Sequence, residues 1–307
     1  MAGEIVRRPD LEAAEVSYPD YVGTKIYKWL PRPQLAGRIY FQDFKSDVTA
    51  QYNRNQAALA DITDNVVASA SDTYSTVELR ARVSMSYAER ITGYHDDESA
   101  DLYMGRVAKR SYMNKIESLC AATLFNATGA TDGTSDPVSA IDTAVATLRD
   151  YAQGRVALVI ANRNKVLLKN NQTIQERMKS TGLGVYDLAE IRNVGDLNLA
   201  AALGCDEILT MKDAIGISGV TGASKDCCAL VVLPDEYEDP TESVQLGRVI
   251  YYTFTDSEDD RFVMESWVDA VHDANVVDCK GLVQLKEFNP ELRKTIRIFD
   301  NESSSAE

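Results

Sequence analysis

The stretch from Asp97 to Asn126, DESADLYMGRVAKRSYMNKIESLCAATLFN, follows the pattern of one long, uninterrupted helix. Its apolar residues recur at intervals of three, four and occasionally five: Met104, Val107, Ala108, Tyr112, Ile116, Leu119, Cys120 and Phe125. This spacing predicts a helix that is buried along one side. Acidic residues at its start suit the positive end of the helix dipole. At 1.5 Å per residue the helix would be roughly 40 Å long, and we call it the spine.

The segments on either side of the spine differ in character. The preceding residues favour extended or loosely organised structure, whereas the following residues alternate strand and helix patterns. A chain organised around one long helix is more typical of an assembly subunit than of an enzyme with a closed pocket. The alternative is an enzyme that happens to contain a long helix.

The charge of the chain is strongly negative and unevenly distributed. The 307 residues carry a net charge of -15, and residues 205–307 hold nine Lys and Arg against 22 Asp and Glu. Such an acidic region repels nucleic-acid phosphates. The composition therefore argues against a protein that grips DNA, but it is compatible with a container that holds DNA without binding it tightly.

Composition also limits cofactors and location. No apolar run of 18 residues is present, which excludes a transmembrane helix, and the first residues lack the apolar core of a secretory signal. The protein is therefore expected to be cytoplasmic in origin. Five cysteines without a CxxC pair predict buried, reduced thiols, and two histidines are too few for a His-rich metal centre. We expect no cofactor and no metal.

Residues 1–35 predict an extended N-terminal arm. Prolines punctuate the segment and its apolar residues show no period. Its aromatic residues, Tyr18, Tyr21, Tyr27 and Trp29, predict docking onto a neighbouring subunit rather than a disordered tail.

Residues 36–85 predict a long protruding β-hairpin. A β-rich run contains Ile39, Tyr40 and Phe41, and a second run alternates apolar and polar residues from Thr76 to Ser84. An isolated hairpin is only marginally stable, so a neighbouring subunit should cover it. The candidate subunit-interface residues are Tyr27, Trp29, Tyr40 and Phe41.

Residues 155–233 predict an α/β layer, which follows a predicted helix. Asp136 and Pro137 suit the start of a helix. Apolar runs predict buried strands that are separated by helices. Asn162 is expected to cap one of these helices, and another is expected to end at Gly204. The expected strands are 155–161, 207–211 and 227–233.

Residues 248–284 predict further strands. Two runs flank an acidic turn, and a later strand pair is expected to turn at Lys280–Gly281. The turn from Asp256 to Asp260 is either a solvated hairpin tip or a cation site, and a second acidic stretch spans 236–242. The glycines at 216, 219 and 222 lack the spacing of a phosphate-binding loop. Motifs of hydrolases, zinc peptidases and dinucleotide enzymes are missing, so no catalytic residue is assigned.

The order of these pieces resembles the major capsid protein of tailed double-stranded DNA bacteriophages. The run ALVIANRNKVLLKNN is similar to the entry into the axial domain of that family, and LNLAAALGCDEILTM is similar to a later segment there. RFVMESWVDAVHDANVVDCKGLVQLKEF is similar to the closing strands beside the spine. The resemblance covers about residues 86–287, with the arm and hairpin matched by position only.

The resemblance implies an α+β capsid fold with an arm, an extended hairpin, a spine in a peripheral domain and an axial α/β domain. The expected divisions are 1–35 arm, 36–85 hairpin loop, 86–154 peripheral domain, 155–247 axial domain, 248–300 return strands of the peripheral domain and 301–307 flexible tail.

The resemblance also implies a non-enzymatic shell subunit. It would form pentamers and hexamers around double-stranded DNA, with a separate scaffolding protein and a portal, without membrane contact, in a virion assembled in the bacterial cytoplasm. The alternatives are an encapsulin-like nanocompartment shell and an α/β enzyme with a site at the strand ends of residues 155–233.

Overall fold

The computed structural model describes residues 5–13, 21–43, 69–93, 97–151, 154–180, 196–212, 220, 222–233, 244–254 and 261–299. Several sequence predictions lie outside these residues. They are Tyr18, the polar stretch between the two runs of the hairpin, Gly216, Gly219, the acidic stretch 236–242, the acidic turn from Asp256 to Asp260 and the tail 301–307.

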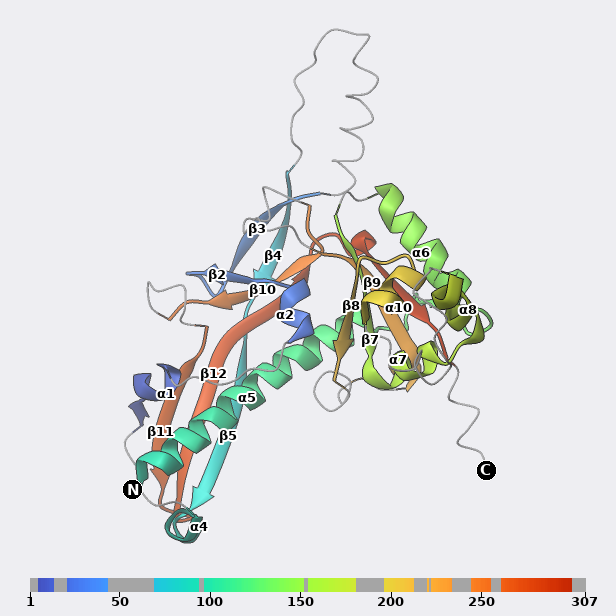
Figure 1. The fold of residues 1–307 in the computed structure, drawn as a ribbon. Helices are drawn as coiled ribbons and strands as arrows, with labels where there is room; N and C mark the ends of the chain where they lie inside the picture. Colours follow the sequence, from blue (N-terminus) through green and yellow to red (C-terminus); the bar gives the residue numbers. More distant parts are fainter. Residues whose placement is uncertain are drawn as a thin grey trace.

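The predicted spine is confirmed as helix α5, Asp97–Leu124, which spans 28 residues. It crosses the molecule diagonally and joins an elongated half to a compact half (Figure 1). Most of the predicted stripe is buried, from Met104 to Phe125. Leu119 was placed on this stripe, but its side chain is 46% exposed, so it lies outside the buried face of the helix.

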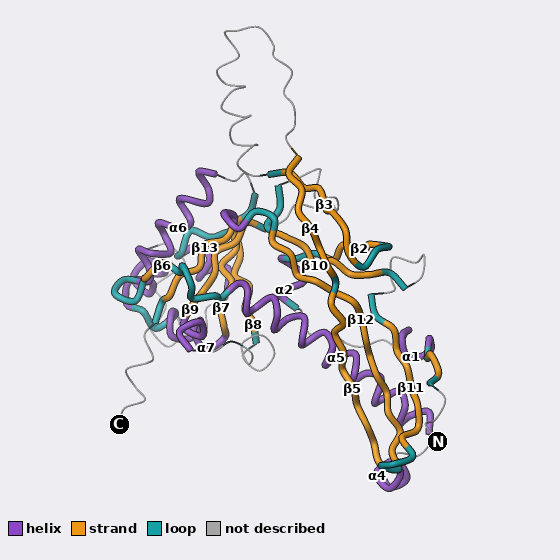
Figure 2. The backbone as a smooth tube through the Cα atoms, turned by 180° about the vertical axis from the view of Figure 1, so that it is seen from behind, coloured by secondary structure: helices purple, strands orange, loops and turns teal. Residues whose placement is uncertain are grey.

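A six-stranded sheet runs along the spine, in the order β1-β11-β12-β10-β2, with β5 also paired to β12. Its strands are β1 Val6–Arg7, β2 Trp29–Arg32, β5 Val77–Ser86, β10 Gly247–Tyr252, β11 Val263–Asp269 and β12 Ala274–Glu287. Strands β5 and β12 lie beside α5 over most of the elongated half (Figure 2). The alternation of β5 is confirmed in part: Ala81 is buried, and Leu79 and Val83 are half-buried on the same face, whereas Val77 is 68% exposed.

The predicted turn at Lys280–Gly281 is wrong. Strand β12 spans 14 residues in all and continues through this point. Its Lys280 pairs with Arg80 of β5, and its Gly281 pairs with Leu79. A glycine is required here because the spine approaches closely: a Cβ atom on Gly281 would lie 2.1 Å from the Oη atom of Tyr112. The glycine therefore marks close packing within a strand rather than a turn.

The hairpin uses a different second strand from the one predicted. Strands β3, Ala36–Gln42, and β4, Ser69–Ser75, pair antiparallel along their full length. The run from Thr76 to Ser84 was expected to form the second strand of the hairpin, but that strand is β4, which ends at Ser75. At the break between β4 and β5, the N–H of Thr76 donates to the carbonyl oxygen of Leu35 over 2.8 Å. The residues that follow form β5 and join the six-stranded sheet, where their apolar side chains meet the spine.

A second sheet of five strands forms the compact half, in the order β6-β13-β9-β7-β8. Its strands are β6 Thr131–Asp132, β7 Val156–Ala161, β8 Glu207–Met211, β9 Cys227–Val232 and β13 Arg293–Arg297. The predicted strands 155–161, 207–211 and 227–233 are thus confirmed within a residue at each end. Strand β13 was grouped with the return strands beside the spine, but it pairs antiparallel with β9 in this sheet.

Helices cover the second sheet (Figure 1). They are α6 Pro137–Tyr151, α7 Asn162–Lys169, α8 Gln172–Ser180 and α10 Asp196–Ala202. Asp136 caps α6 as predicted, because its Oδ1 atom accepts the N–H of Ser139 over 3.1 Å. Helix α6 was grouped with the spine, but it packs on β7, β9 and β13. Asn162 is the first residue of α7 rather than its cap.

The predicted arm is a folded part of the subunit. Helices α1, Pro9–Ala13, and α2, Val22–Ile26, pack against α5, and strands β1 and β2 extend the six-stranded sheet. Leu11 and Ile26 are almost completely buried. The prediction of an aperiodic arm without a core was wrong because its apolar residues meet partners that lie far away in the sequence.

Three short elements complete the described fold. They are helix α4, Tyr87–Gly93, and the 3₁₀ turns η2, Gly222–Asp226, and η3, Pro290–Leu292. In the part of the chain that the structure describes, no helix combines the length and apolar character needed to cross a bilayer.

We predict that Gly281→Ala destabilises the subunit. The added Cβ would overlap Tyr112 and also lie 2.8 Å from the carbonyl oxygen of Arg261, so overpacking should cost about 1–3 kcal/mol of unfolding free energy. Urea unfolding followed by circular dichroism measures the loss. Adding Tyr112→Phe removes the nearest atom and should restore part of the stability.

Gly93→Ala is the matched control, because its Cβ would meet nothing within 4 Å. Equal unfolding midpoints for Gly281→Ala and Gly93→Ala would show that the spine does not press on β12 at this point.

Candidate assembly surfaces

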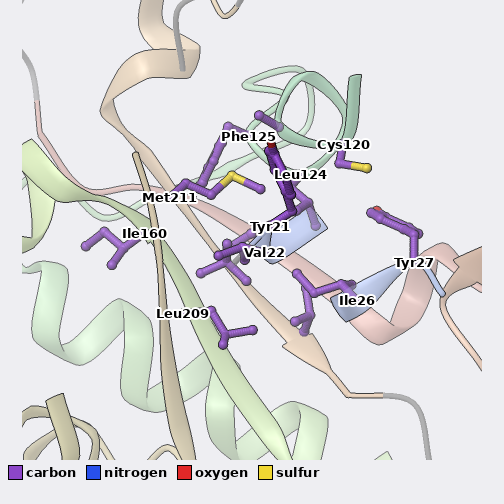
Figure 3. Close-up of a cluster of buried hydrophobic side chains, with 14 of the residues drawn as sticks. Tyr21, Val22, Ile26, Tyr27, Cys120, Leu124, Phe125, Ile160, Leu209 and Met211 are labelled. Carbon is purple, nitrogen blue, oxygen red and sulfur yellow. The ribbon is translucent and has the colours of Figure 1, made fainter. Parts of the chain in front are cut away.

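Helix α2 fills the junction between the spine and the two sheets. Figure 3 shows Val22 and Ile26 pointing toward Leu209 and Met211 of β8, beside Leu124 at the end of α5. All five side chains are buried. The N-terminal segment therefore holds the elongated and compact halves together within one subunit.

Tyr27 belongs to this core and not to a subunit interface. Its side chain is 0% exposed, and its Oη atom donates a hydrogen bond to Oε1 of Glu287 over 2.6 Å. Burial, together with the negative charge of Glu287, raises the pKa of Tyr27 well above its usual value. Glu287 is in turn held by Arg293, with Nε and Oε1 3.1 Å apart. The proposed contact of Tyr27 with a neighbour is corrected accordingly.

Phe41 is also a residue of the subunit's own core. It packs in a small cluster below the hairpin, and its ring stacks on Phe288 with centroids 4.9 Å apart and planes inclined by 15°. Only 7% of Phe41 is exposed. The cluster consists of Leu30, Ile39, Phe41, Tyr74, Ile250 and Phe288. The hairpin therefore rests on its own sheet before any neighbour binds.

Tyr40 and Trp29 retain exposed surface. Tyr40 points to the opposite face of β3 from Phe41 and is 53% exposed. Trp29 is half-buried on the edge strand β2, where its ring meets Tyr251 edge-on at 5.6 Å and the guanidinium of Arg261 lies 5.3 Å from its centroid. A contact of Tyr40 or Trp29 with a neighbouring subunit remains a prediction.

Polar contacts that the sequence did not reveal fix the base of the hairpin. The N–H of Ser75 donates to Oε1 of Gln284 over 2.7 Å, and Lys286 pairs with Asp72 over 2.7 Å. The hydrogen bond from Lys286 lowers the pKa of Asp72. These partners lie about two hundred residues apart in the chain, so no local sequence pattern could have predicted them.

The far end of the elongated half exposes several apolar side chains. They are Tyr87, Tyr103, Val268 and Val271, of which Val271 is 87% exposed. Helix α4 is fixed at this end by a capping box: Oε2 of Glu89 accepts the N–H of Ser86 over 3.1 Å, and the N–H of Glu89 donates to Oγ of Ser86 over 3.3 Å. At the same end, the exposed His272 has its Nδ1 atom 2.7 Å from Oδ2 of Asp269.

The strand ends that an enzyme would use are occupied by structural contacts. After β7, Asn164 donates to the carbonyl oxygen of Lys225 over 2.7 Å, and Arg163 pairs with Asp226 over 2.7 Å. Lys165 donates to Oγ1 of Thr210 over 2.9 Å. These polar groups fasten α7 to the second sheet, which favours a structural role for this edge.

The described residues contain no group of three or more His, Cys, Asp or Glu side chains that could hold a metal ion. All five cysteines are free and buried, which confirms the prediction of reduced thiols. Burial raises the pKa of Cys205 to about 12 and that of Cys227 to about 11. Both thiols therefore stay protonated near neutral pH.

Comparison with solved structures places the fold. A phage-related protein from Bordetella bronchiseptica matches with a TM-score of 0.65 and 15% identity, over 96% of this chain and 97% of that chain. The mature capsid of bacteriophage PhiM1 matches with a TM-score of 0.53 and 11% identity, over 92% of this chain and 89% of that one. The chain has the major capsid protein fold of tailed bacteriophages.

The same capsid fold is shared with a further particle. A virus-like particle from Pyrococcus furiosus matches with a TM-score of 0.50 and 9% identity, over 94% of each chain. No protein-family model and no curated protein sequence matches the chain. The capsid fold is therefore established by structure, at sequence identities too low to carry function.

In this capsid fold, the exposed large apolar residues lie on several separate surfaces. Around the hairpin they are Leu35, Tyr40 and Val77. At or beside the far end they are Val6, Tyr87, Tyr103, Val268 and Val271, with Val6 next to Val268. On α7 they are Val166 and Leu167, and elsewhere they are Ile5 and Leu119. The dispersed arrangement suits a subunit that makes several modest contacts.

We predict opposite effects for two neighbouring residues of the hairpin. Tyr40→Ala should leave the unfolding free energy within about 1 kcal/mol but weaken assembly by about 2 kcal/mol or more, as expected for an aromatic interface anchor. Phe41→Ala should instead lower subunit stability by about 3–5 kcal/mol, because it leaves a cavity against Phe288. Urea unfolding and sedimentation velocity separate the two effects.

Arg38→Ala is the control, since Arg38 is exposed on the same face as Tyr40. If Tyr40→Ala assembled as well as the wild type, the outer face of the hairpin would have no part in subunit contacts.

Proposed function

We propose that the chain is a structural subunit of an icosahedral capsid, assembled from pentamers and hexamers around double-stranded DNA. The observation that carries the proposal is the end-to-end match to the phage-related protein and to the phage capsid, which covers nearly the whole of each chain. Such a match includes the elongated half, the hairpin and the second sheet together.

The shape of the subunit supports this proposal. Strands β3 and β4 lie at one end of the elongated half, near the compact half, and the far end of the elongated half reaches away from the compact half (Figure 1). Both extremities carry exposed apolar residues, Tyr40 on the hairpin and Val271 at the far end. Contacts at widely separated points allow each subunit to bind several neighbours at once.

The proposed partners are those that a capsid subunit would need. A separate scaffolding protein would guide assembly, a portal would admit the DNA, and the DNA would be held without sequence-specific contacts. The net charge of -15 supports weak contact with DNA. The protein would be located in the virion capsid after assembly in the host bacterial cytoplasm.

An encapsulin-like compartment shell is the alternative within the same fold. The particle from Pyrococcus furiosus is a less close match than the phage-related protein, with TM-scores of 0.50 and 0.65. The α/β enzyme is disfavoured by the structural contacts at the strand ends, such as that between Asn164 and Lys225. We therefore propose a non-enzymatic role.

Electron microscopy of the purified chain tests the proposal. We expect closed shells or rings of five and six subunits, formed alone or with a co-expressed scaffolding protein. Shells that enclose a host protein cargo would support the compartment instead. A chain that stays monomeric at high concentration under both conditions would contradict either kind of shell.

We also predict weak and nearly salt-independent binding to DNA. Residues 205–307 hold 22 acidic against nine basic residues, so few phosphates can be neutralised and few counterions released. Fluorescence anisotropy with a labelled duplex at increasing salt measures this. Tight binding at low salt that falls steeply with added salt would contradict the proposed passive contact.

A further inference from the structure

A buried carboxylate on the spine binds the start of helix α2. Glu117 is 3% exposed and its carboxylate faces the backbone of the N-terminal segment. Its Oε1 atom accepts the N–H of Val22 over 2.9 Å, and its Oε2 atom accepts the N–H of Gly23 over 2.8 Å. Glu117 therefore satisfies two amides at the first turn of α2 that have no partner within so short a helix.

The backbone of α2 is seated directly on the spine at this point. A Cβ atom on Gly23 would lie 2.4 Å from the Cβ of Cys120 and 2.7 Å from Oε2 of Glu117. Glycine is required because any side chain would lift the segment away from the carboxylate. Close seating and the paired hydrogen bonds thus depend on each other.

The segment held by Glu117 joins the two halves of the subunit. Helix α2 packs against α5, β8 and β10, and its apolar side chains fill the junction (Figure 3). Tyr21 anchors one end by donating to Oδ1 of Asn114 over 2.9 Å, and Tyr27 anchors the other through Glu287. Any change in how tightly α2 is held would therefore act on the connection between the two sheets.

The two hydrogen bonds and the burial of Glu117 have opposite effects on its pKa. Only the ionised carboxylate offers both oxygens as acceptors, because protonation turns one of them into a donor. Burial nevertheless raises the pKa of Glu117 to about 7, and the hydrogen bonds from Gly23 and Val22 offset only part of this rise. The free-energy cost of burying the charged carboxylate thus exceeds the cost of losing one hydrogen-bond acceptor, so burial favours the protonated form.

The ionisable neighbours do not compete with Glu117 near neutral pH. Burial raises the pKa of Tyr21 to about 12, with Arg110 opposing and Glu117 adding to the rise. Burial also raises the pKa of Cys120 well above its usual value.

The elements on the other sides of α2 contribute no unpaired charge in the region described. Strand β8 presents Leu209 and Met211 (Figure 3), β10 presents the buried Val249 and Tyr251, and Glu287 of β12 is paired with Arg293. Lys25 on α2 itself is exposed to solvent.

We propose that Glu117 is a proton-operated latch that sets how tightly α2 is held against the spine and the second sheet. The latch is a property of the subunit itself and does not depend on the proposed capsid function. When α2 is docked, Glu117 titrates at about 7; when α2 is released, the carboxylate is hydrated and returns to its ordinary value of 4.5. The docked state therefore binds the proton more tightly.

The direction of the effect follows from this difference. Docking of α2 is strongest below about pH 4.5, weakens as the pH rises, and becomes constant above about pH 7. Between pH 5 and pH 8 the docking equilibrium should fall by roughly ten- to a hundredfold, according to the linkage between proton binding and conformation.

Hydrogen exchange on the full-length chain tests the latch. Protection of the amides of residues 21–27 is measured by mass spectrometry between pH 5 and pH 8, corrected for intrinsic exchange rates and compared with a peptide from the middle of α5. We expect protection of 21–27 to fall by ten- to a hundredfold as the pH rises, while α5 stays unchanged.

Two variants identify the residue responsible. Glu117→Gln mimics the protonated form, so protection of 21–27 should no longer depend on pH. Glu176→Gln on the exposed face of α8 is the matched control and should behave as the wild type. Retention of the wild-type pH dependence in Glu117→Gln would overturn the proposal.

A direct titration covers the case in which Glu117→Gln does not fold. Carbon-13 NMR of the wild-type glutamate carboxyl groups should show one group with a midpoint near 7, assigned through its coupling to the Val22 and Gly23 amides. A midpoint in the usual range for Glu117, or pH-independent protection of 21–27 in the wild type, would also overturn the proposal.

Discussion

The subunit depends on the contact between the spine and the long strand β12. The hydroxyl of Tyr112 lies so close to Gly281 that no side chain fits between the helix and the strand. This close approach sets the distance between α5 and the six-stranded sheet. Strand β5, which also packs against α5, pairs with β12 over ten residue pairs. The Tyr112–Gly281 approach and the β5–β12 pairing together determine how the helix and the sheet pack along the elongated half.

The N-terminal segment is the second constraint, because it packs against the spine and against strands of both sheets. Residues near Leu11 pack on the spine beside Gly105, where an added Cβ would lie 3.3 Å from the leucine side chain. Farther along, Ile26 enters the junction with the second sheet. One aperiodic stretch thus closes the cores of both halves, and its loss would expose apolar surface on the spine.

Sequence reasoning succeeded where the deciding interactions are local. The periodicity of α5 predicted its start and nearly its end, and Asp136 was identified as a cap because the amide it binds is only three residues away. It failed where the partner is distant. Tyr27 was assigned to an interface because no partner for it could be recognised nearby in the sequence. Its partner, Glu287, lies 260 residues later. Gly281 was predicted to form a turn because the side chain that requires a glycine there, Tyr112, lies on another element.

The same distinction explains which assembly surfaces the sequence could indicate. The β-rich run of β3 was recognised, but both Tyr40 and Phe41 were assigned to an interface. Nothing local in the sequence shows that Phe41 stacks on the subunit's own Phe288 while Tyr40 faces outward. The cluster around Phe288 means that the base of the hairpin is folded within the single subunit, before any neighbour could bind. Association then requires less ordering of the chain than an arm that folds on binding, and the exposed side chains on its outer face remain free to determine the contact.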